Sequence, residues 1–251
     1  YDPDFEGDAG PINRVIGSGP VDTINWLIGL DRLIIGAQGS EIAARSSSLD
    51  EPLTPSNFNM KSASTQGSYP LQALRVDTRG VYVQRGGNRI FELTQDNQSF
   101  GYASEDLTVL VPELASPGIV RMAVQRQPDT RMHFVRSDGT VMMSAYDKTE
   151  KVLCFFNIET DGTIEDVVVL PGATGSAEDQ VYYVVNRTIN SATVRYLEKW
   201  AKETECRGGT LNKQADSFVV YDGSNLTHLN GEAVIAGAAG VDLSPDVAGT
   251  Q

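Results

Sequence analysis

Apolar residues along this chain fall into short runs separated by turns that are rich in Gly, Asp and Asn. We predict β-strands for these runs, because alternation of apolar and polar residues with period two is typical of a strand with one buried face. The predicted strands, in chain order, are Ile24–Gly29, Arg32–Gln38, Glu41–Ser46, Phe58–Ala63, Leu71–Asp77, Gly80–Arg85, Arg89–Thr94, Gly118–Gln125, Met132–Arg136, Val141–Tyr146, Val152–Ile158, Ile164–Leu170, Val181–Arg187, Ala192–Trp200 and Ser217–Asp222.

The strands form four units with a common layout, in which a first and a second run are followed by a tight turn and a third run. Anchor residues in the second runs, Ile34, Tyr82, Phe134 and Tyr183, are spaced 48, 52 and 49 residues apart. That period matches a four-stranded propeller blade. We therefore predict an all-β fold, a β-propeller-like array of short antiparallel four-stranded blades. A two-sheet sandwich is the alternative, and the near-constant spacing favours the array.

The units define the expected domain organisation. Residues 1–22 are rich in Gly, Pro and Asp, which is typical of an arm or linker. The opening at Tyr1 without a Met suggests a piece of a longer protein, so that the array is incomplete here. The predicted segments are an arm (1–22), the propeller-like domain (23–234, with units at about 23–66, 71–114, 118–160 and 164–222) and the start of a further element or insert (235–251).

One turn carries a specific prediction. Gly86 and Gly87 separate two alternating runs, which indicates a tight hairpin in which glycine supplies positive φ. We expect valine at either position to destabilise this hairpin, because β-branched residues resist positive φ.

Charge and cysteine content narrow the function classes. The formal net charge is −13, from 33 acidic and 20 basic residues, which argues against a surface that grips nucleic-acid phosphates. Cys154 lies in an apolar run and is predicted to be a buried small hydrophobe. With Cys206 as the second of 2 cysteines, no disulfide framework is indicated. Since no apolar run reaches the roughly 20 residues of a membrane helix, membrane insertion is not expected.

Candidate chemistry is sparse. His133 and His228 have no partner at metal-ligand spacing, and His133 is expected to be a packed strand residue. No nucleophile elbow is present. The turns at Asp138, Asp161 and Asp222 are Asp-Gly turns that do not extend into calcium loops. Glycosylation-type triplets start at Asn97, Asn186 and Asn225, and are interpreted as chance matches.

Acidic pairs and aromatic residues were the remaining candidates. The acidic pairs are Glu105-Asp106, Glu165-Asp166 and Glu178-Asp179. They are not expected to be catalytic, since adjacent acids on a strand point to opposite faces and acids on a loop are usually just solvated. Tyr69, Phe100 and Tyr102 fit either a binding face or core and turn packing. We therefore predict no enzyme activity, and no catalytic, cofactor-binding or metal-binding residue.

A set of phrases nevertheless resembles a known family. The chain is similar to phage and prophage tail proteins of the tail tubular protein B, or nozzle, kind, across most of residues 23–234. The phrases are Thr23-Ile-Asn-Trp-Leu27, Leu33-Ile-Ile-Gly-Ala-Gln-Gly-Ser-Glu41, Val83-Gln-Arg-Gly-Gly87, Asp106-Leu-Thr108 and Arg187-Thr-Ile-Asn-Ser-Ala-Thr-Val-Arg-Tyr-Leu-Glu198.

The resemblance implies a virion tail component, made in the bacterial host cytoplasm, with a propeller-like β core. It implies partners as well: other copies in a ring, adaptor and fibre proteins, and DNA that passes through without specific binding. An acidic channel wall would repel DNA rather than trap it. Two alternatives stay open: a propeller that recognises host glycans through its loops, and a glycan hydrolase, suggested only by the acidic residues.

Overall fold

Antiparallel strands account for nearly all regular structure in the described part of this protein. The computed structural model describes residues 7–16, 23–46, 51–96, 101–189 and 191–202. Within these ranges the only helix is η1 (Pro112–Ala115), a single 3₁₀ turn. The strands are β1 (Ile24–Gly29), β2 (Leu33–Ala37), β3 (Glu41–Arg45), β4 (Asn59–Ser64), β5 (Leu74–Val76), β6 (Arg79–Val83), β7 (Ile90–Asp96), β8 (Gly101–Asp106), β9 (Ile119–Gln125), β10 (Arg131–Arg136), β11 (Val141–Asp147), β12 (Val152–Ile158), β13 (Thr163–Leu170), β14 (Gln180–Ile189) and β15 (Ala192–Lys199).

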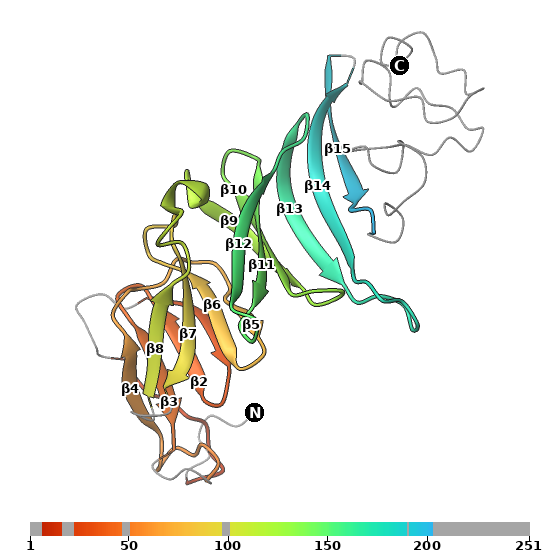
Figure 1. The fold of residues 1–251 in the computed structure, drawn as a ribbon. Helices are drawn as coiled ribbons and strands as arrows, with labels where there is room; N and C mark the ends of the chain where they lie inside the picture. The colour runs from red at the N-terminus through yellow and green to blue at the C-terminus, as the bar shows by residue number, and fades with distance from the viewer. Residues whose placement is uncertain (1–6, 17–22, 47–50, 97–100, 190, 203–251) are drawn as a thin grey trace. The chain divides into compact units, whose positions relative to one another are not determined.

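Each sheet is a meander in which strands that follow one another along the chain lie side by side (Figure 1). β1–β4, β5–β8 and β9–β12 form four-stranded sheets, and β13–β15 form a three-stranded one. The fold is therefore the predicted all-β, propeller-like array of small antiparallel sheets. The predicted strand Ser217–Asp222 and segment 235–251 lie outside the described residues.

The second sheet contains a strand that the sequence pattern did not predict. β8 carries one buried large apolar residue, Tyr102, among small and charged neighbours. With so few apolar residues, period-two alternation gives no signal. Most other predicted strands agree with the structure to within a few residues, which is the usual error at strand ends.

The chain divides into two compact units. Unit 1 comprises Tyr1–Val124 with Phe155–Asn157, and unit 2 comprises Gln125–Cys154 with Ile158–Gln251.

The core of unit 1 lies between its first two sheets. Buried side chains of both sheets form one cluster in which Ile34 and Tyr82, two of the repeat anchors, are fully buried. The ring centroids of Trp26 and Tyr82 lie 5.4 Å apart, and those of Tyr82 and Phe91 lie 6.0 Å apart. In unit 1, two of the repeat anchors therefore lie where neighbouring sheets meet.

The first sheet buries both of its faces, which explains why its central strands are continuously apolar. Ile34 points into the main cluster, whereas Ile35 packs on the opposite face with Ile42 and Ala44. Half-buried Ile16 and Phe58 pack against that second face. A strand that is covered on both sides needs apolar residues at every position rather than at alternate ones.

Unit 2 is built around β14. Val181, Tyr183 and Val185 alternate with less buried residues along this strand, and they place one face in the core. A backbone hydrogen bond from Ile164 N–H to the carbonyl of Gly139 (2.8 Å) connects the β13–β15 sheet to the β10–β11 turn. The anchor residues Phe134 and Tyr183 are both buried here.

The Gly86-Gly87 turn has the predicted special backbone at only one position. Gly87 has φ +81°, and a Cβ there would lie 3.3 Å from the Tyr69 ring. Gly86 is not in the positive-φ region, and a Cβ there would meet only the Asn88 side-chain oxygen, at 3.2 Å. We expect Gly87→Val to lower the free energy of unfolding by about 1–3 kcal/mol.

Gly86→Val is the matched control, with an expected loss below about 1 kcal/mol. Chemical denaturation followed by circular dichroism measures both values. Equal losses in the two variants would contradict the assignment of positive φ to Gly87 alone.

Candidate functional surfaces

The histidine on β10 is a buried structural residue. His133 is 1% exposed, and its Nδ1 lies 2.6 Å from the hydroxyl of Tyr183. Its Nε2 lies 3.4 Å from Oε1 of Gln125, which can only accept a hydrogen bond. Nε2 therefore carries the proton, and the Tyr183 hydroxyl donates to Nδ1. Burial, together with the charge of Arg131, lowers the pKa of His133 to about 4, so the ring is neutral near pH 7.

The most unusual polar group in unit 1 is the carboxyl of Glu41, at the start of β3. Its side chain is fully buried, and Oε1 accepts a hydrogen bond from Ser68 (2.7 Å), while Oε2 has no hydrogen-bond partner. Burial raises the pKa of Glu41, and nearby hydroxyls, Ser68 first, only partly offset this rise. Glu92, also fully buried, instead forms an ion pair with Arg79 at 2.7 Å.

This environment predicts that unit 1 is less stable at high pH. A carboxyl whose pKa is raised on folding contributes its full stability below its unfolded pKa, near 4.5, and loses it as the pH rises through the folded value. We expect Glu41→Gln to be more stable than the wild type at pH 8, by about 1 kcal/mol or more, and to approach it near pH 4.

Thermal unfolding of both proteins across this pH range measures the effect. Glu51→Gln, at an exposed acid, is the matched control and should follow the wild type. A Glu41→Gln variant that is less stable than the wild type at pH 8 would contradict a buried, proton-binding carboxyl.

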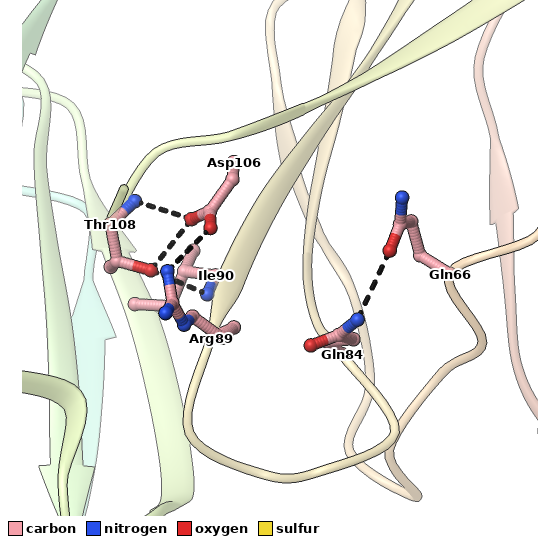
Figure 2. Close-up of polar contacts among 6 residues, drawn as sticks. All are labelled: Gln66, Gln84, Arg89, Ile90, Asp106 and Thr108. Atoms are coloured by element: carbon pink, nitrogen blue, oxygen red, sulfur yellow. Dashed lines mark hydrogen bonds and ion pairs between the residues drawn. The ribbon is translucent and has the colours of Figure 1, made fainter. Parts of the chain in front are cut away.

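The acidic residue at the end of β8 is engaged in a turn. Figure 2 shows the carboxylate of Asp106 pointing toward Arg89 and Thr108. Oδ2 of Asp106 lies 2.9 Å from Nη1 of Arg89, and Oδ1 accepts hydrogen bonds from both the backbone N–H and the hydroxyl of Thr108, each at 2.8 Å. The Thr108 hydroxyl in turn accepts from the backbone N–H of Ile90 at 3.3 Å. This set of contacts fixes the start of β7 to the end of β8.

Arg89 and Gln84 lie on opposite sides of the β6–β7 turn. On the Gln84 side, the Gln84 amide donates to the side-chain oxygen of Gln66 (3.0 Å; Figure 2). The backbone N–H of Arg85 bonds the carbonyl of Gly67 at 2.9 Å. The segment that links the first two sheets is therefore tied to the hairpin by side-chain and backbone contacts.

The other two acidic pairs also contain structural acids. Glu165 accepts two hydrogen bonds from Arg195, at 2.7 and 3.1 Å, and this contact lowers its pKa. Asp179 accepts from the backbone N–H groups of Arg126 (2.8 Å), Gln127 (3.0 Å) and Gly172 (3.3 Å). The prediction that these acids are merely solvated is wrong for Asp106, Glu165 and Asp179, because backbone and arginine donors surround their carboxylates. It is also wrong for Glu178, which is 5% exposed.

The prediction for Cys154 is also wrong. This cysteine is exposed, although its neighbours in the sequence are apolar. β12 is the outermost strand of its sheet, and Val152, Leu153 and Phe156 are each at least 40% exposed. The apolar run by itself predicts burial, whereas its place at the sheet edge leaves it open to solvent.

The structure places the remaining candidates as follows. Tyr102 is 9% exposed and belongs to the core of unit 1, and Tyr69 is half-buried against Gly87. Core and turn packing, the second of the two interpretations, is therefore correct for both. Asn186 donates to Glu165 at 3.1 Å. The candidates that lie outside the described residues are Asn97, Phe100, Cys206, Asp222, Asn225 and His228.

A further apolar surface lies on the outer face of the β13–β15 sheet. Val168 (45% exposed) and Leu197 (68% exposed) point to the same face, since Val168 pairs with Tyr182 and Leu197 pairs with Val184 two residues along β14. Leu170, 48% exposed, continues this face along β13. Sequence reasoning did not identify this surface, because exposure depends on whether another layer covers the sheet.

Among the residues that the structure describes, no group of three or more His, Cys, Asp or Glu side chains could hold a metal ion. In the same ranges, no helix has the length and apolar character needed to cross a bilayer.

Comparisons with known proteins give no match, either to a family model or to a curated protein.

Proposed function

We propose that this chain is a structural component of a phage tail, similar to the nozzle at the end of the tail, and that it assembles through subunit contacts around the DNA exit path. The proposal rests on the resemblance described above and on the roles of the residues that carry it. Those residues maintain the fold: Trp26 lies in the core of unit 1, and Asp106 ties the end of β8 to the start of β7 through Thr108 and Arg89. A subunit that assembles with other copies needs a stable fold, and residues of this kind provide it.

The last segment that carries the resemblance, residues 187–198, includes parts of β14 and β15. Arg187 forms a two-point ion pair with Glu198, at 2.5 and 2.8 Å, and also donates to the backbone carbonyl of Asp161. This paired geometry is the one in which Arg and a carboxylate interact most strongly. The contact aligns two strands of unit 2, and it supports a structural role for the phrase.

The negative net charge of the chain is consistent with a role beside the DNA exit path. With a net charge of −13, the chain is expected to repel DNA phosphates on average, which suits a wall that DNA passes. The outer face of the β13–β15 sheet supplies apolar area for a neighbouring subunit.

Size-exclusion chromatography with light scattering and negative-stain microscopy of the 251-residue chain test assembly. We expect closed, ring-shaped oligomers at high concentration that Leu197→Asp disrupts. Thr174→Asp, at an exposed polar position of the β13–β14 loop and off this face, is the matched control. A wild-type chain that stays monomeric throughout the concentration range would count against the proposal. Binding of the monomer on a glycan array would favour the glycan-recognition alternative.

A further inference from the structure

β12 is an edge strand with unusual composition. It is the terminal strand of the order β12-β11-β10-β9, so one row of its backbone N–H and C=O groups faces away from its sheet. Its seven residues, Val152–Ile158, contain no charged side chain and no proline. Val152, Leu153 and Phe156 are 44%, 40% and 40% exposed. An exposed apolar edge of this kind is a template for another strand.

β4 and β8, the last strands of the other two four-stranded sheets, differ from β12 in carrying charged side chains. β4 carries Lys61 near its centre, and β8 ends in Glu105 and Asp106. Charged side chains on an edge strand are a common device against edge-to-edge pairing. β12 lacks this device, although its sheet has the same meander topology. The difference suggests that the edge of β12 has a partner strand.

We propose that β12 pairs antiparallel with β12 of a second copy of this chain, with Phe155 on the two-fold axis. In this register Val152 lies opposite Ile158, Leu153 opposite Asn157, and Cys154 opposite Phe156. All seven residues of the strand are paired, and each copy extends the sheet of the other.

Charge complementarity at the strand ends selects this register. Lys151 directly precedes β12 and Glu159 directly follows it, and both are exposed. With Phe155 at the centre, the turn residue Lys151 (φ +56°) at the start of β12 in each copy lies next to Glu159 at the end of β12 in the other. The two-fold axis therefore brings two pairs of opposite charge together at the strand ends. Opposite charges across neighbouring strands stabilise pairing, and like charges destabilise it.

Shifting the centre by one residue loses this match. A centre at Cys154 would place Lys151 opposite Asn157. A centre at Phe156 would place Glu159 opposite Leu153, which puts a charge within the apolar strand. The register centred on Phe155 keeps both charges outside the paired apolar residues.

The pairing also gathers apolar side chains on one face. Alternate residues of a strand share a face, so Val152, Cys154, Phe156 and Ile158 lie together. Cross-strand pairing sets Val152 against Ile158 and Cys154 against Phe156, which makes this face apolar in both copies. The net charge of −13 per chain opposes association. At 0.15 M salt, however, the screening length is about 8 Å, which weakens repulsion between distant acids.

This contact is independent of the proposed function. A two-fold contact uses the same surface on both copies and closes at two subunits, whereas a ring requires two different surfaces. The Leu197→Asp variant tests the ring, and the variants below act on β12, so that failure of one proposal is distinguishable from failure of the other.

Disulfide trapping tests the register. In a Cys154→Ser, Cys206→Ser background, Phe155→Cys places two cysteines directly opposite each other, with Cα atoms about 4.5–5.5 Å apart, which suits a disulfide. We expect a covalent dimer of twice 27.1 kDa under mild oxidation. The matched control is Leu153→Cys, whose two copies would be offset by four residues, or about 13 Å, and should not crosslink. Equal crosslinking at both positions, or none at residue 155, would overturn the proposal.

Charge reversal tests the end pairs without relying on cysteines. We expect Lys151→Glu to weaken dimerisation by about tenfold or more, and Glu159→Lys to do the same, as measured by sedimentation equilibrium. The double variant should recover most of the wild-type affinity. Lys61→Glu on β4 is the control and should leave dimerisation unchanged. These measurements use the Leu197→Asp background, which removes the proposed ring contact. In that background, a chain that is monomeric at all concentrations, or a double charge variant no better than the singles, would refute β12 pairing.

Discussion

Replacing Gly36 by alanine is expected to lower the free energy of unfolding of unit 1 by about 3 kcal/mol. Gly36 lies in β2 directly against the indole of Trp26, and a Cβ there would lie 2.0 Å from Cε2 and 2.4 Å from Cδ2 and Cζ2. The indole is 3% exposed and packs on Tyr82, so it cannot move away without disturbing the core. Thermal and chemical denaturation followed by circular dichroism would measure the loss.

Gly29→Ala is the matched control in the same sheet. No atom lies within 4 Å of a Cβ at Gly29, so we expect little change. A double-mutant cycle with Trp26→Leu identifies the clash: Gly36→Ala should cost much less once the indole is gone. If Gly36→Ala melts like the wild type, the close approach of Trp26 to β2 is wrong.

Unit 2 is expected to lose stability in mild acid because of His133. Its pKa is lowered on folding from 6.5 to about 4, so the unfolded chain binds the proton more readily. The stability associated with the neutral ring is fully present above pH 6.5 and decreases as the pH falls toward 4. Each pH unit in this window costs up to about 1.4 kcal/mol, or about 3 kcal/mol in total.

NMR titration of the His133 ring measures its pKa in the folded protein, and unfolding at pH 7 and pH 4.5 measures the linked loss. His133→Gln should show a smaller loss between these two pH values than the wild type, since the same carboxylates titrate in both proteins. A His133 that titrates near 6.5, or a variant with the same pH dependence as the wild type, would contradict the buried neutral ring. Glu41 in unit 1 has the opposite sign and loses stability as the pH rises.

The repeat was predictable because burial between sheets imposes a regular spacing of large apolar residues. Ile34, Tyr82, Phe134 and Tyr183 lie in the middle strands of their sheets, and all four are buried. Gly87 was predictable for a related local reason, since a tight hairpin requires positive φ at a particular position. The sequence pattern did not predict β8, because this strand has a single large buried residue, Tyr102, and therefore shows no apolar alternation.

Polar partners were beyond the reach of sequence patterns. Asp179 and Arg126 lie 53 positions apart along the chain, and only the folded loops bring the carboxylate to the backbone donor. The same holds for Glu41, whose neighbour Ser68 lies on the segment that joins the first two sheets. Each was one acid among many in the sequence, and neither showed a motif.

The sequence by itself determined the all-β class, the order of the sheets and the residues that form their centres, because alternation and repeat length reflect local backbone geometry and burial. The tertiary structure alone decided which strands form the edges, and therefore why Val152 and Cys154 are exposed while the equally apolar β2 is buried. An apolar run records only that a segment can be buried. Whether it is buried depends on the layers that other parts of the chain place over it.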